Sequence, residues 1–313
     1  MRLFVKCKLQ MTLGHLSNIL LVFLIFSPVT TSAQGAPARE YLNIPVNQAA
    51  IFGDILGTNG ETAADSDIPL PNNVTITRNV FLSSIWSFPQ FDRYGGVAVS
   101  AGYAKVHVSG ASGEVETWGF TDPSVTLIAN VFGAPALSIE EFPKAIPQKN
   151  QCSVRLVVHA PLGSYDNNSA VNTGANRWAF TPIVNLDITP DKGVSWIDLY
   201  AGGRWVTNNN AFQGNNVLSQ NPLGVVTAHY SHNIGKRMWA GIGVHYDNGG
   251  ASSVNHISQH DYANNFRPAA IVNRRIGKFS FTLRYENTAS KPNAAPTNWL
   301  LSIRVAGPVY PFL

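Results

Sequence analysis

The 313-residue sequence has few charged residues, only two cysteines and, after its first thirty residues, no long apolar run. Lys, Arg, Asp and Glu together make up 13 % of the chain, whereas about a quarter is usual in a soluble domain. Apolar residues nevertheless make up 45 %. The shortage of charge argues against an ordinary soluble surface, and the shortage of apolar runs argues against spanning helices in the rest of the chain.

The N-terminus has the features of a secretory signal peptide. Three basic residues precede an apolar run of eight residues, Ile19–Phe26, and Thr31–Ala33 supplies a small-residue cleavage site. A membrane anchor would need ~20 apolar residues. We therefore predict a signal peptide at residues 1–33 and a mature domain at 34–313 that begins at Gln34.

Removal of this leader changes the cysteine and charge counts. It would take away Cys7 and leave Cys152 alone, so no intrachain disulfide is expected. Three of the 22 Lys and Arg residues lie in the leader, which leaves 19 against 18 Asp and Glu and a mature net charge of +1. Because the mature sequence also has no dense basic run, nucleic acid is not an expected partner.

Alternation of apolar and polar residues with a period of two predicts β-strands through most of the mature sequence. The clearest segments are Lys278–Glu286, Met238–Tyr246 and Trp299–Val305. In the first of them, every second residue is apolar: Phe279, Phe281, Leu283 and Tyr285. Helical periodicity is nearly absent, and the best helix candidate is the short stretch Leu137–Ile146.

Twelve strands are predicted on this basis. They cover 43–53, 74–86, 95–107, 123–132, 152–160, 177–189, 194–206, 222–233, 237–247, 265–275, 278–287 and 298–306. Most have the ~9–11 residues of a tilted membrane strand, and single-chain bacterial barrels have an even number of strands. The predicted fold class is all-β: a closed antiparallel transmembrane β-barrel of about 12 strands.

The connections between these strands alternate in length. Outer-membrane barrels join their strands by long external loops and short periplasmic turns in alternation, and four of the five even-numbered gaps are short. The exception is 133–151, whose role the sequence does not reveal. A soluble secreted β-protein remains an alternative, and it would expose no continuous apolar band.

Several phrases of the sequence resemble a known family. They are Gly119–Pro123, Phe132–Leu137, Pro161–Asp166, Asn172–Trp178, Leu218–Pro222 and Tyr285–Asn287. In their order and spacing they are similar to the family named for the MetA pathway of phenol degradation, and the similarity spans roughly residues 38–306. The resemblance implies an outer-membrane, transporter-like barrel and uptake of small aromatic compounds. It implies no catalytic residues, and each phrase also has a plain reading as turn-forming chemistry.

Motifs for catalysis and metal binding are weak. Ser231 and His232 are adjacent, but neighbours on a strand point to opposite faces, and no Gly-x-Ser-x-Gly elbow occurs. His256 and His260 are four residues apart and precede Asp261, a spacing that would bind a metal on a helix, but they lie in a polar loop. We expect no enzymatic activity and no cofactor.

Charged residues on the polar faces of the strands are the candidate functional residues. A charge on the lipid face would cost about 2–4 kcal/mol at the bilayer midplane for Arg or Lys, so these side chains are expected to line the lumen. They are Arg155, His159, Asp187, Asp198, Arg204, Arg267, Arg284, Glu286 and Arg304.

The leading hypothesis is passive uptake of a small-molecule solute across the outer membrane, with membrane lipid as the other partner. One alternative is a structural or adhesive barrel with a sealed lumen. Another is a membrane-embedded hydrolase, which would need a Ser/His pair on the lipid-facing wall. The sequence identifies neither the solute nor the oligomeric state.

Overall fold

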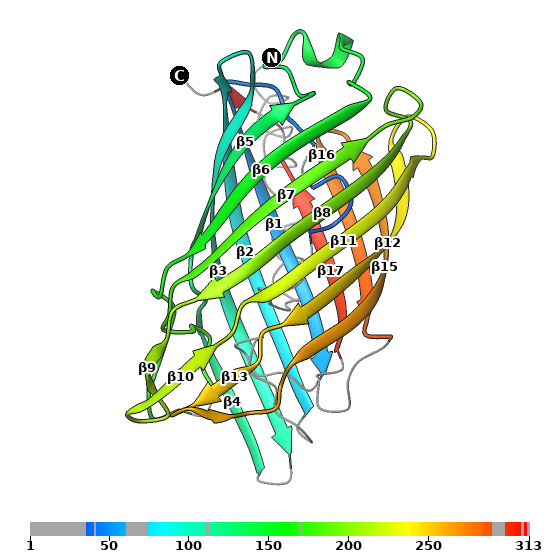
Figure 1. The fold of residues 1–313 in the computed structure, drawn as a ribbon. Helices are drawn as coiled ribbons and strands as arrows, with labels where there is room; N and C mark the ends of the chain where they lie inside the picture. The colour runs from blue at the N-terminus through cyan, green and yellow to red at the C-terminus, as the bar shows by residue number, and fades with distance from the viewer. Residues whose placement is uncertain are drawn as a thin grey trace, which may run out of the picture.

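The computed structural model describes residues 36–40, 42–60, 74–110, 113–169, 171–289, 298–307 and 310–311. The described chain is almost entirely β-structure (Figure 1). Among these residues, no helix combines the length and the apolar character needed to cross a bilayer. The predicted leader, 1–33, lies outside the described residues.

Twelve antiparallel strands form a closed barrel, which confirms the predicted fold. They are β1 (Gln48–Gly60), β2 (Val74–Gln90), β3 (Arg93–Gly110), β5 (Ser124–Phe132), β6 (Asn150–His159), β7 (Ala179–Ile188), β8 (Ser195–Val206), β11 (Leu223–Asn233), β12 (Met238–Gly249), β15 (Ala263–Ile276), β16 (Phe279–Asn287) and β17 (Asn298–Ala306). Each of these strands pairs with the barrel strand before it and the barrel strand after it in chain order. The register Phe52↔Ala306 to Gly60↔Asn298 joins the first strand to the last and closes the sheet.

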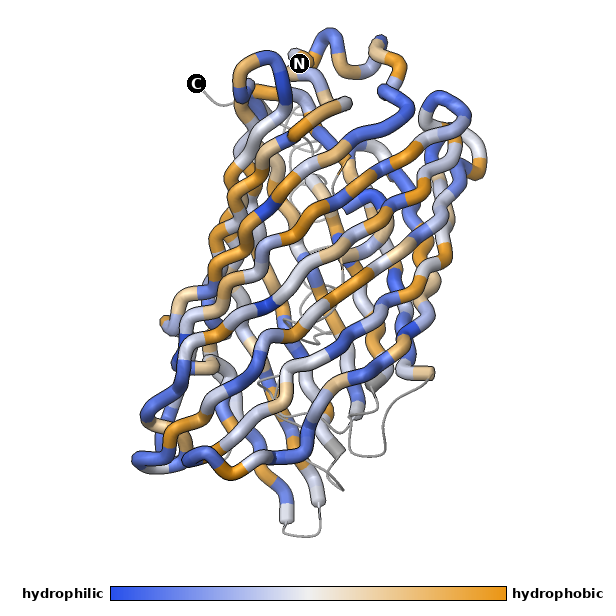
Figure 2. The backbone as a smooth tube through the Cα atoms, in the orientation of Figure 1, coloured by the Kyte–Doolittle hydropathy of each residue, from blue (hydrophilic) through white to orange (hydrophobic). Residues whose placement is uncertain are grey.

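The barrel is apolar outside and polar inside. Along β15, for example, Phe266 is exposed while Arg267 beside it is buried. In the described chain, 34 buried side chains are polar or charged and 18 are apolar, the reverse of a soluble core. The tube in Figure 2 shows the alternation of orange and blue along each strand. An exterior band of this extent exceeds what soluble monomers expose, so the soluble alternative does not fit.

The two ends of the barrel differ as the sequence predicted. At one end, the turn end, β2–β3, β7–β8, β11–β12 and β15–β16 are joined by two to six residues. At the other, the loop end, the connections are longer and contain β4 (Gly113–Phe120) and a small sheet. That sheet consists of β9 (Asn209–Phe212), β10 (Asn216–Gln220), β13 (Ser252–Val254) and β14 (Ile257–Ser258). In Figure 1 the turn end is at the top and the loop end at the bottom.

The first strand was predicted too early in the sequence. It begins at Gln48 rather than 43 and extends to Gly60. Pro45 lacks an amide hydrogen, and Asn47 has a φ of 57°, in the left-handed region. Neither residue can continue a strand ladder easily, so the chain turns there and enters the sheet only afterwards. A two-residue strand, β18 (Tyr310–Pro311), pairs with the start of β1.

The best helix candidate of the sequence, Leu137–Ile146, forms no α-helix. Only a 3₁₀ turn, η1 (Phe142–Lys144), forms there. Pro143 within this stretch removes a donor from any longer helix. The segment before η1 instead folds along the barrel rim, where the Tyr94 amide donates to the Ala134 carbonyl (2.9 Å).

Candidate functional site

The nine predicted lumen residues all lie on the strand face opposite the exposed apolar rows. Seven of them are buried: Arg155, Asp187, Asp198, Arg204, Arg267, Arg284 and Glu286. His159 and Arg304 are partly buried. The structure brings six of the nine into three groups on different parts of the wall.

The first group lies on β12, β15 and β16. Glu286 accepts from Arg284 on its own strand, and its Oε1 lies 2.9 Å from Nε2 of His245. Arg267 pairs with Asp247 at 2.8 Å. Because charges are alternately positive and negative across these adjacent strands, each carboxylate has a cation within reach, as a buried charge requires.

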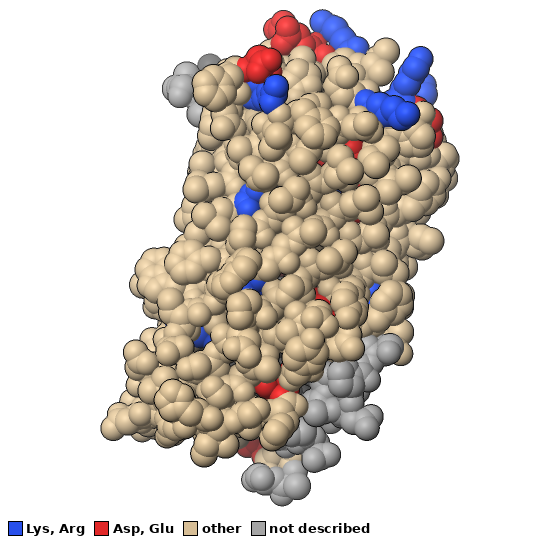
Figure 3. Space-filling view, in the orientation of Figure 1, with Lys and Arg blue, Asp and Glu red and all other residues tan. Residues whose placement is uncertain are grey.

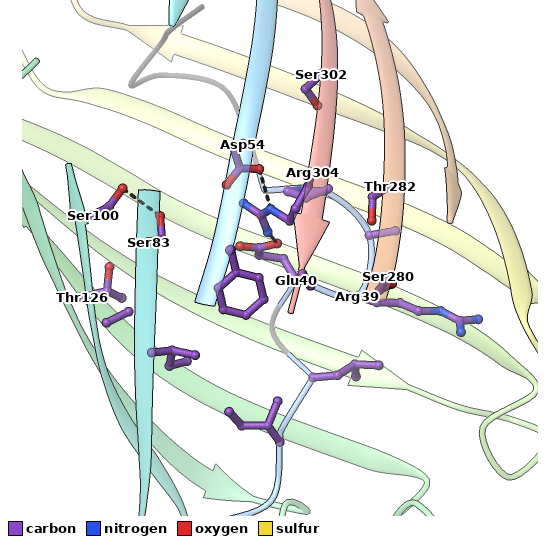
Figure 4. Close-up of a pocket in the computed structure, with 18 of the residues that line it drawn as sticks. Arg39, Glu40, Asp54, Ser83, Ser100, Thr126, Ser280, Thr282, Ser302 and Arg304 are labelled. Carbon is purple, nitrogen blue, oxygen red and sulfur yellow. Dashed lines mark hydrogen bonds and ion pairs between the residues drawn. The ribbon is translucent and has the colours of Figure 1, made fainter. Parts of the chain in front are cut away.

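The second group surrounds Arg304, near the turn end of β17. Its Nε lies 2.6 Å from Oδ1 of Asp54 on β1, and its Nη1 pairs with Glu40 of the N-terminal segment. Figure 4 shows Arg304 between these two carboxylates. This group therefore joins the first strand, the last strand and the chain that precedes the barrel.

The third group is formed by Asp187 on β7 and Asp198 on β8, which are paired across the two strands. Two like charges placed opposite each other are unfavourable unless donors surround them. The Asn185 amide donates to Asp187 (2.7 Å), and the backbone amide of Arg39 donates to Asp198 (3.0 Å).

The remaining three residues are Arg155, His159 and Arg204, and Arg155 lies close enough to Asp187 of the third group to interact with it electrostatically. Arg155 lines the wall of the interior cavity from β6. His159 and Arg204 lie at the loop-end halves of β6 and β8.

An N-terminal segment, residues 36–40 and 42–47, runs inside the barrel and is the main feature that sequence reasoning missed. The Arg39 guanidinium donates to Ser231 (2.8 Å) and Asn233 (2.7 Å), and it lies 4.8 Å from the ring centroid of Trp239. Farther along, Val46 packs against Tyr94 in a small apolar cluster at the turn end. The alternation at Ile44 and Val46 instead predicts a strand there, so the sequence did not reveal that this segment enters the barrel.

The rim segment between β5 and β6 holds this N-terminal segment in place. The Val46 amide donates to the Leu137 carbonyl (2.8 Å), and Ala134 belongs to the same apolar cluster as Val46. Residues 134–137 thus have a structural role, which is to clamp the chain that enters the barrel.

Other interior residues were missed for simpler reasons. Asp54 fell one residue beyond the predicted end of the first strand. His229, His245 and Asp247 lie on the predicted polar faces of their strands, and all three are buried. The alternation alone could have identified them.

A cavity of about 480 Å³ lies between the N-terminal segment and the barrel wall. Its walls combine hydroxyl groups, charges and apolar side chains. The hydroxyls come from Ser83, Ser84, Ser100, Thr126, Ser280, Thr282 and Ser302, several of which are visible in Figure 4. Four guanidinium groups, from Arg39, Arg155, Arg284 and Arg304, and two carboxylates, from Glu40 and Asp54, complete the polar part. Leu42, Ile44, Phe52 and Leu56 are among the apolar residues.

The Ser231–His232 dipeptide divides between the two faces, as expected for a strand. Ser231 is buried and accepts from Arg39, while His232 is exposed on the outer wall. There, Nδ1 of His232 lies 2.8 Å from Oγ of Ser195. A Ser/His pair is therefore present on the outer wall, but Ser195 is only 4 % exposed. Within the described chain, no carboxylate bonds to His232 to orient its ring.

The histidines of the β12–β15 loop do not converge on Asp261. His256 and His260 are exposed, whereas the Asp261 carboxylate is buried and accepts from the Ser252 amide (2.6 Å) and hydroxyl (2.5 Å). In the part of the chain that the structure describes, no cluster of three or more metal-ligating side chains occurs. Asp261 therefore stabilises the loop by accepting hydrogen bonds from Ser252.

The Gly- and Asp-containing phrases that carry the family resemblance come together at the loop end. The Asp122 carboxylate accepts from the amides of Gly163 and Ala175, each at 2.8 Å. A Cβ on Gly174 would lie 2.7 Å from the backbone of Gly163, closer than any real contact. These residues hold the loop before β7 against the start of β5, which supports the interpretation that they form turns.

Two titratable groups in the connections at the turn end have shifted pKa values. Hydrogen bonds from the side chain and amide of Ser195 lower the pKa of Asp191. Hydrogen bonds from the Ser138 amide and hydroxyl lower the pKa of Glu141. Both carboxylates are therefore anionic at neutral pH and stabilise the turns that hold them.

Comparisons with known proteins show a family match and solved structures with a similar fold. A family model described as "Putative MetA-pathway of phenol degradation" matches residues 47–301. The crystal structure of the COG4313 outer membrane channel from Pseudomonas putida F1 is similar, with a TM-score of 0.74 and 17 % identity over 88 % of this chain and 100 % of that chain. The beta domain of the Bordetella autotransporter BrkA has a TM-score of 0.50 and 10 % identity over 85 % and 100 % of the two chains. At these identities the likeness shows the fold alone. Among the curated proteins compared by sequence, none matches.

Proposed function

The chain belongs to the family described as "Putative MetA-pathway of phenol degradation", and on that premise we propose that it is an outer-membrane channel for passive uptake of small molecules. The observation that carries this proposal is the cavity of about 480 Å³ inside a closed, polar-lined barrel. Small-molecule sites commonly measure ~300–1,000 Å³. The solute is moved and not altered.

The composition of the cavity wall favours solutes that have an aromatic ring and an anionic or hydroxyl group. Four guanidinium groups face two carboxylates, so the local excess of charge is positive. The hydroxyls supply donors and acceptors, and Phe52, Leu56 and Ile44 supply apolar contact. The phenol pathway in the family description is consistent with this chemistry. The nine charged residues predicted from the sequence, with Asp54 and Glu40, would line the route.

The proposed location is the bacterial outer membrane, with the turn end toward the periplasm, because short turns face that side in outer-membrane barrels. Delivery there would use the leader at residues 1–33. Mass spectrometry of the purified protein should then give Gln34 as the first residue. A mature protein that retains Ile19–Phe26 would contradict this part of the proposal.

Liposome swelling with an aromatic carboxylate, such as benzoate, tests the uptake proposal. Liposomes that contain the protein should swell faster than empty ones, and Ser302→Trp should slow them because Ser302 lines the cavity. The matched control is Leu301→Trp, since Leu301 is exposed on the outer wall and its replacement should leave swelling unchanged. Swelling no faster than that of empty liposomes would contradict uptake.

A second candidate is a sealed barrel that binds a partner at its loop end. The small sheet of β9, β10, β13 and β14 favours it, because this sheet gives the loop end an ordered, protruding platform. A sealed barrel predicts no swelling with any solute, so the same experiment separates the two functions.

Hydrolysis is a third candidate, favoured only by the Ser195–His232 pair. Its geometry is poor for catalysis, because a nucleophile needs access to substrate and a base that is itself oriented by a third group. We propose that the pair is structural. The purified protein should hydrolyse a nitrophenyl ester no faster than buffer does, and activity abolished by Ser195→Ala would overturn this view.

A further inference from the structure

Six cations gather around three adjacent connections at the turn end, four of them in the connections and two near the end of β15, and we call them the basic rim. They are Lys192, Lys236, Arg237, Arg274, Arg275 and Lys278, and all are exposed. Arg275 is paired with Ser280, which lines the cavity, so it lies on the inner face of β15. Strands β7, β8, β11, β12, β15 and β16 are consecutive in the barrel, so their turns lie side by side. Figure 3 shows blue side chains over the β7–β8 and β11–β12 turns at the upper right.

The three connections of the basic rim contain a single acidic residue. This residue is Asp191, whose carboxylate already accepts from the Ser195 amide at 2.6 Å. The other two connections at the same end carry three acidic residues, Asp92, Glu140 and Glu141, and two basic ones, Lys144 and Lys149, while Arg93 follows Asp92 as the first residue of β3. Positive charge is therefore concentrated on one side of the turn end and balanced on the other.

The six cations have no side-chain partner in the described part of the chain. By contrast, the charged residues inside the barrel pair closely, as Arg267 does with Asp247. Six unpaired cations on neighbouring turns repel one another. A negatively charged ligand would reduce this repulsion.

The position of Arg274 indicates where such a ligand lies. Arg274 is paired with Met238 on one side and Phe281 on the other, so it lies on the outer face between two apolar side chains. Val272, two residues away on the same face, is exposed on the apolar wall. The Arg274 head group thus emerges at the edge of the apolar band, where long cationic side chains extend to the membrane interface.

Apolar residues flank the cations within the turns themselves. Ile234 lies beside Lys236, and Ile276, which is 58 % exposed, lies between Arg275 and Lys278. A ligand that contacts this surface therefore meets apolar and cationic groups together. A phospholipid has both an acyl chain and a phosphate, whereas an acidic protein would gain little from the apolar edge.

We propose that the basic rim, apart from the inward-facing Arg275, binds the phosphate groups of anionic phospholipids in the leaflet that faces the turn end. Guanidinium and ammonium groups form strong charge-assisted hydrogen bonds to phosphate, and cations near an anionic membrane surface are attracted to it. The binding fixes the depth and tilt of the barrel on one side. It does not depend on whether the interior conducts a solute.

Native mass spectrometry of lipid retained by the mature protein tests this proposal. The protein is reconstituted in equal mixtures of phosphatidylcholine and phosphatidylglycerol and then stripped with detergent. The wild type should retain phosphatidylglycerol in preference. The double variant Lys236→Ser, Lys278→Ser should lose that preference by up to about fivefold per cation. The matched control, Lys144→Ser with Lys149→Ser, removes the same charge at the same end and should retain the preference.

Two results would overturn the proposal. They are equal retention of the two lipids by the wild type and equal loss of the preference in the two double variants. High salt should weaken retention in the wild type, because exposed charges are screened. Gel mobility before boiling reports whether each variant is folded. If the serine variant does not fold, Lys236→Arg with Lys278→Arg should keep the preference, and its loss there would equally contradict phosphate binding.

Discussion

Glu286 is 1 % exposed, and its carboxylate is held by Arg284 and His245 inside the barrel. Removing one partner of a buried ionic group costs about 3–5 kcal/mol because the other charge stays buried and unpaired. We expect Glu286→Gln to lower the free energy of unfolding by about 3 kcal/mol. Urea unfolding in lipid vesicles, followed by tryptophan fluorescence, measures it.

The matched control is Glu116→Gln, which breaks the exposed pair with Lys105 (2.8 Å). An exposed pair contributes at most about 1 kcal/mol, so this variant should unfold nearly as the wild type does. Equal effects of the two substitutions would show that the interior charges are solvated. If the barrel conducts, Glu286→Gln should also shift the reversal potential toward anions, because excess positive charge is left on the wall.

At the β7–β8 turn, the lowered pKa of Asp191 makes stability depend on pH. Hydrogen bonds from Ser195 favour its ionised form in the folded protein. Its contribution is complete above the unfolded pKa, about 3.9, and disappears as the pH falls through the lower folded pKa. Asp191→Ala should therefore melt below the wild type at pH 7, with the difference vanishing in strong acid. A difference that is the same at both pH values would mean that the charge of Asp191 contributes nothing.

Among the elements, the N-terminal segment should narrow the interior. The double variant Arg39→Ala, Glu40→Gln removes the bonds to Ser231, Asn233 and Arg304. Hydrogen bonds to charged groups contribute about 1.5–3 kcal/mol each, so the segment should leave its place in a large fraction of molecules. Single-channel recordings should show a higher conductance than the wild type. Arg237→Ala, which removes a cation that has no side-chain partner among the described residues, should leave conductance unchanged. An unaltered conductance in the double variant would show that the segment does not obstruct the route.

Eleven of the twelve strands could be predicted because lipid on one side and polar interior on the other impose a strict alternation. The same alternation placed Arg284 and Glu286 on the buried face. By the same period of two, Trp196 shares a face with Asp198 and Trp239 shares a face with His245. In the structure Trp196 is buried, and the Arg39 guanidinium lies over the Trp239 ring. A tryptophan of a membrane barrel can thus face the polar interior as well as the membrane–water interface.

The N-terminal segment could not be predicted from sequence, for a physical reason. Its residues are held by partners nearly 200 positions away, such as Ser231 and Asn233 for Arg39. Such contacts depend on the closed barrel and leave no periodic trace. The first strand was misplaced for a related reason: the apolar residues Ile44 and Val46 look like strand residues, but they pack into the turn-end cluster.

Closure of the whole barrel depends on pairing between the two ends of the chain, β1 and β17. Leu56 and Ser302 are directly paired there, and both line the cavity. Paired residues on antiparallel strands have Cα atoms about 4.5–5.5 Å apart, within the range that a disulfide requires. With Cys7 and Cys152 replaced by serine, Leu56→Cys with Ser302→Cys should therefore oxidise to a crosslink that closes a large loop. The crosslinked chain should migrate faster than the reduced chain on a boiled, non-reducing gel. Leu56→Cys with Thr126→Cys is the control, since Thr126 also lines the cavity but lies on β5, which does not pair with β1. No crosslink in the first pair, or equal crosslinking in both, would contradict a closed barrel.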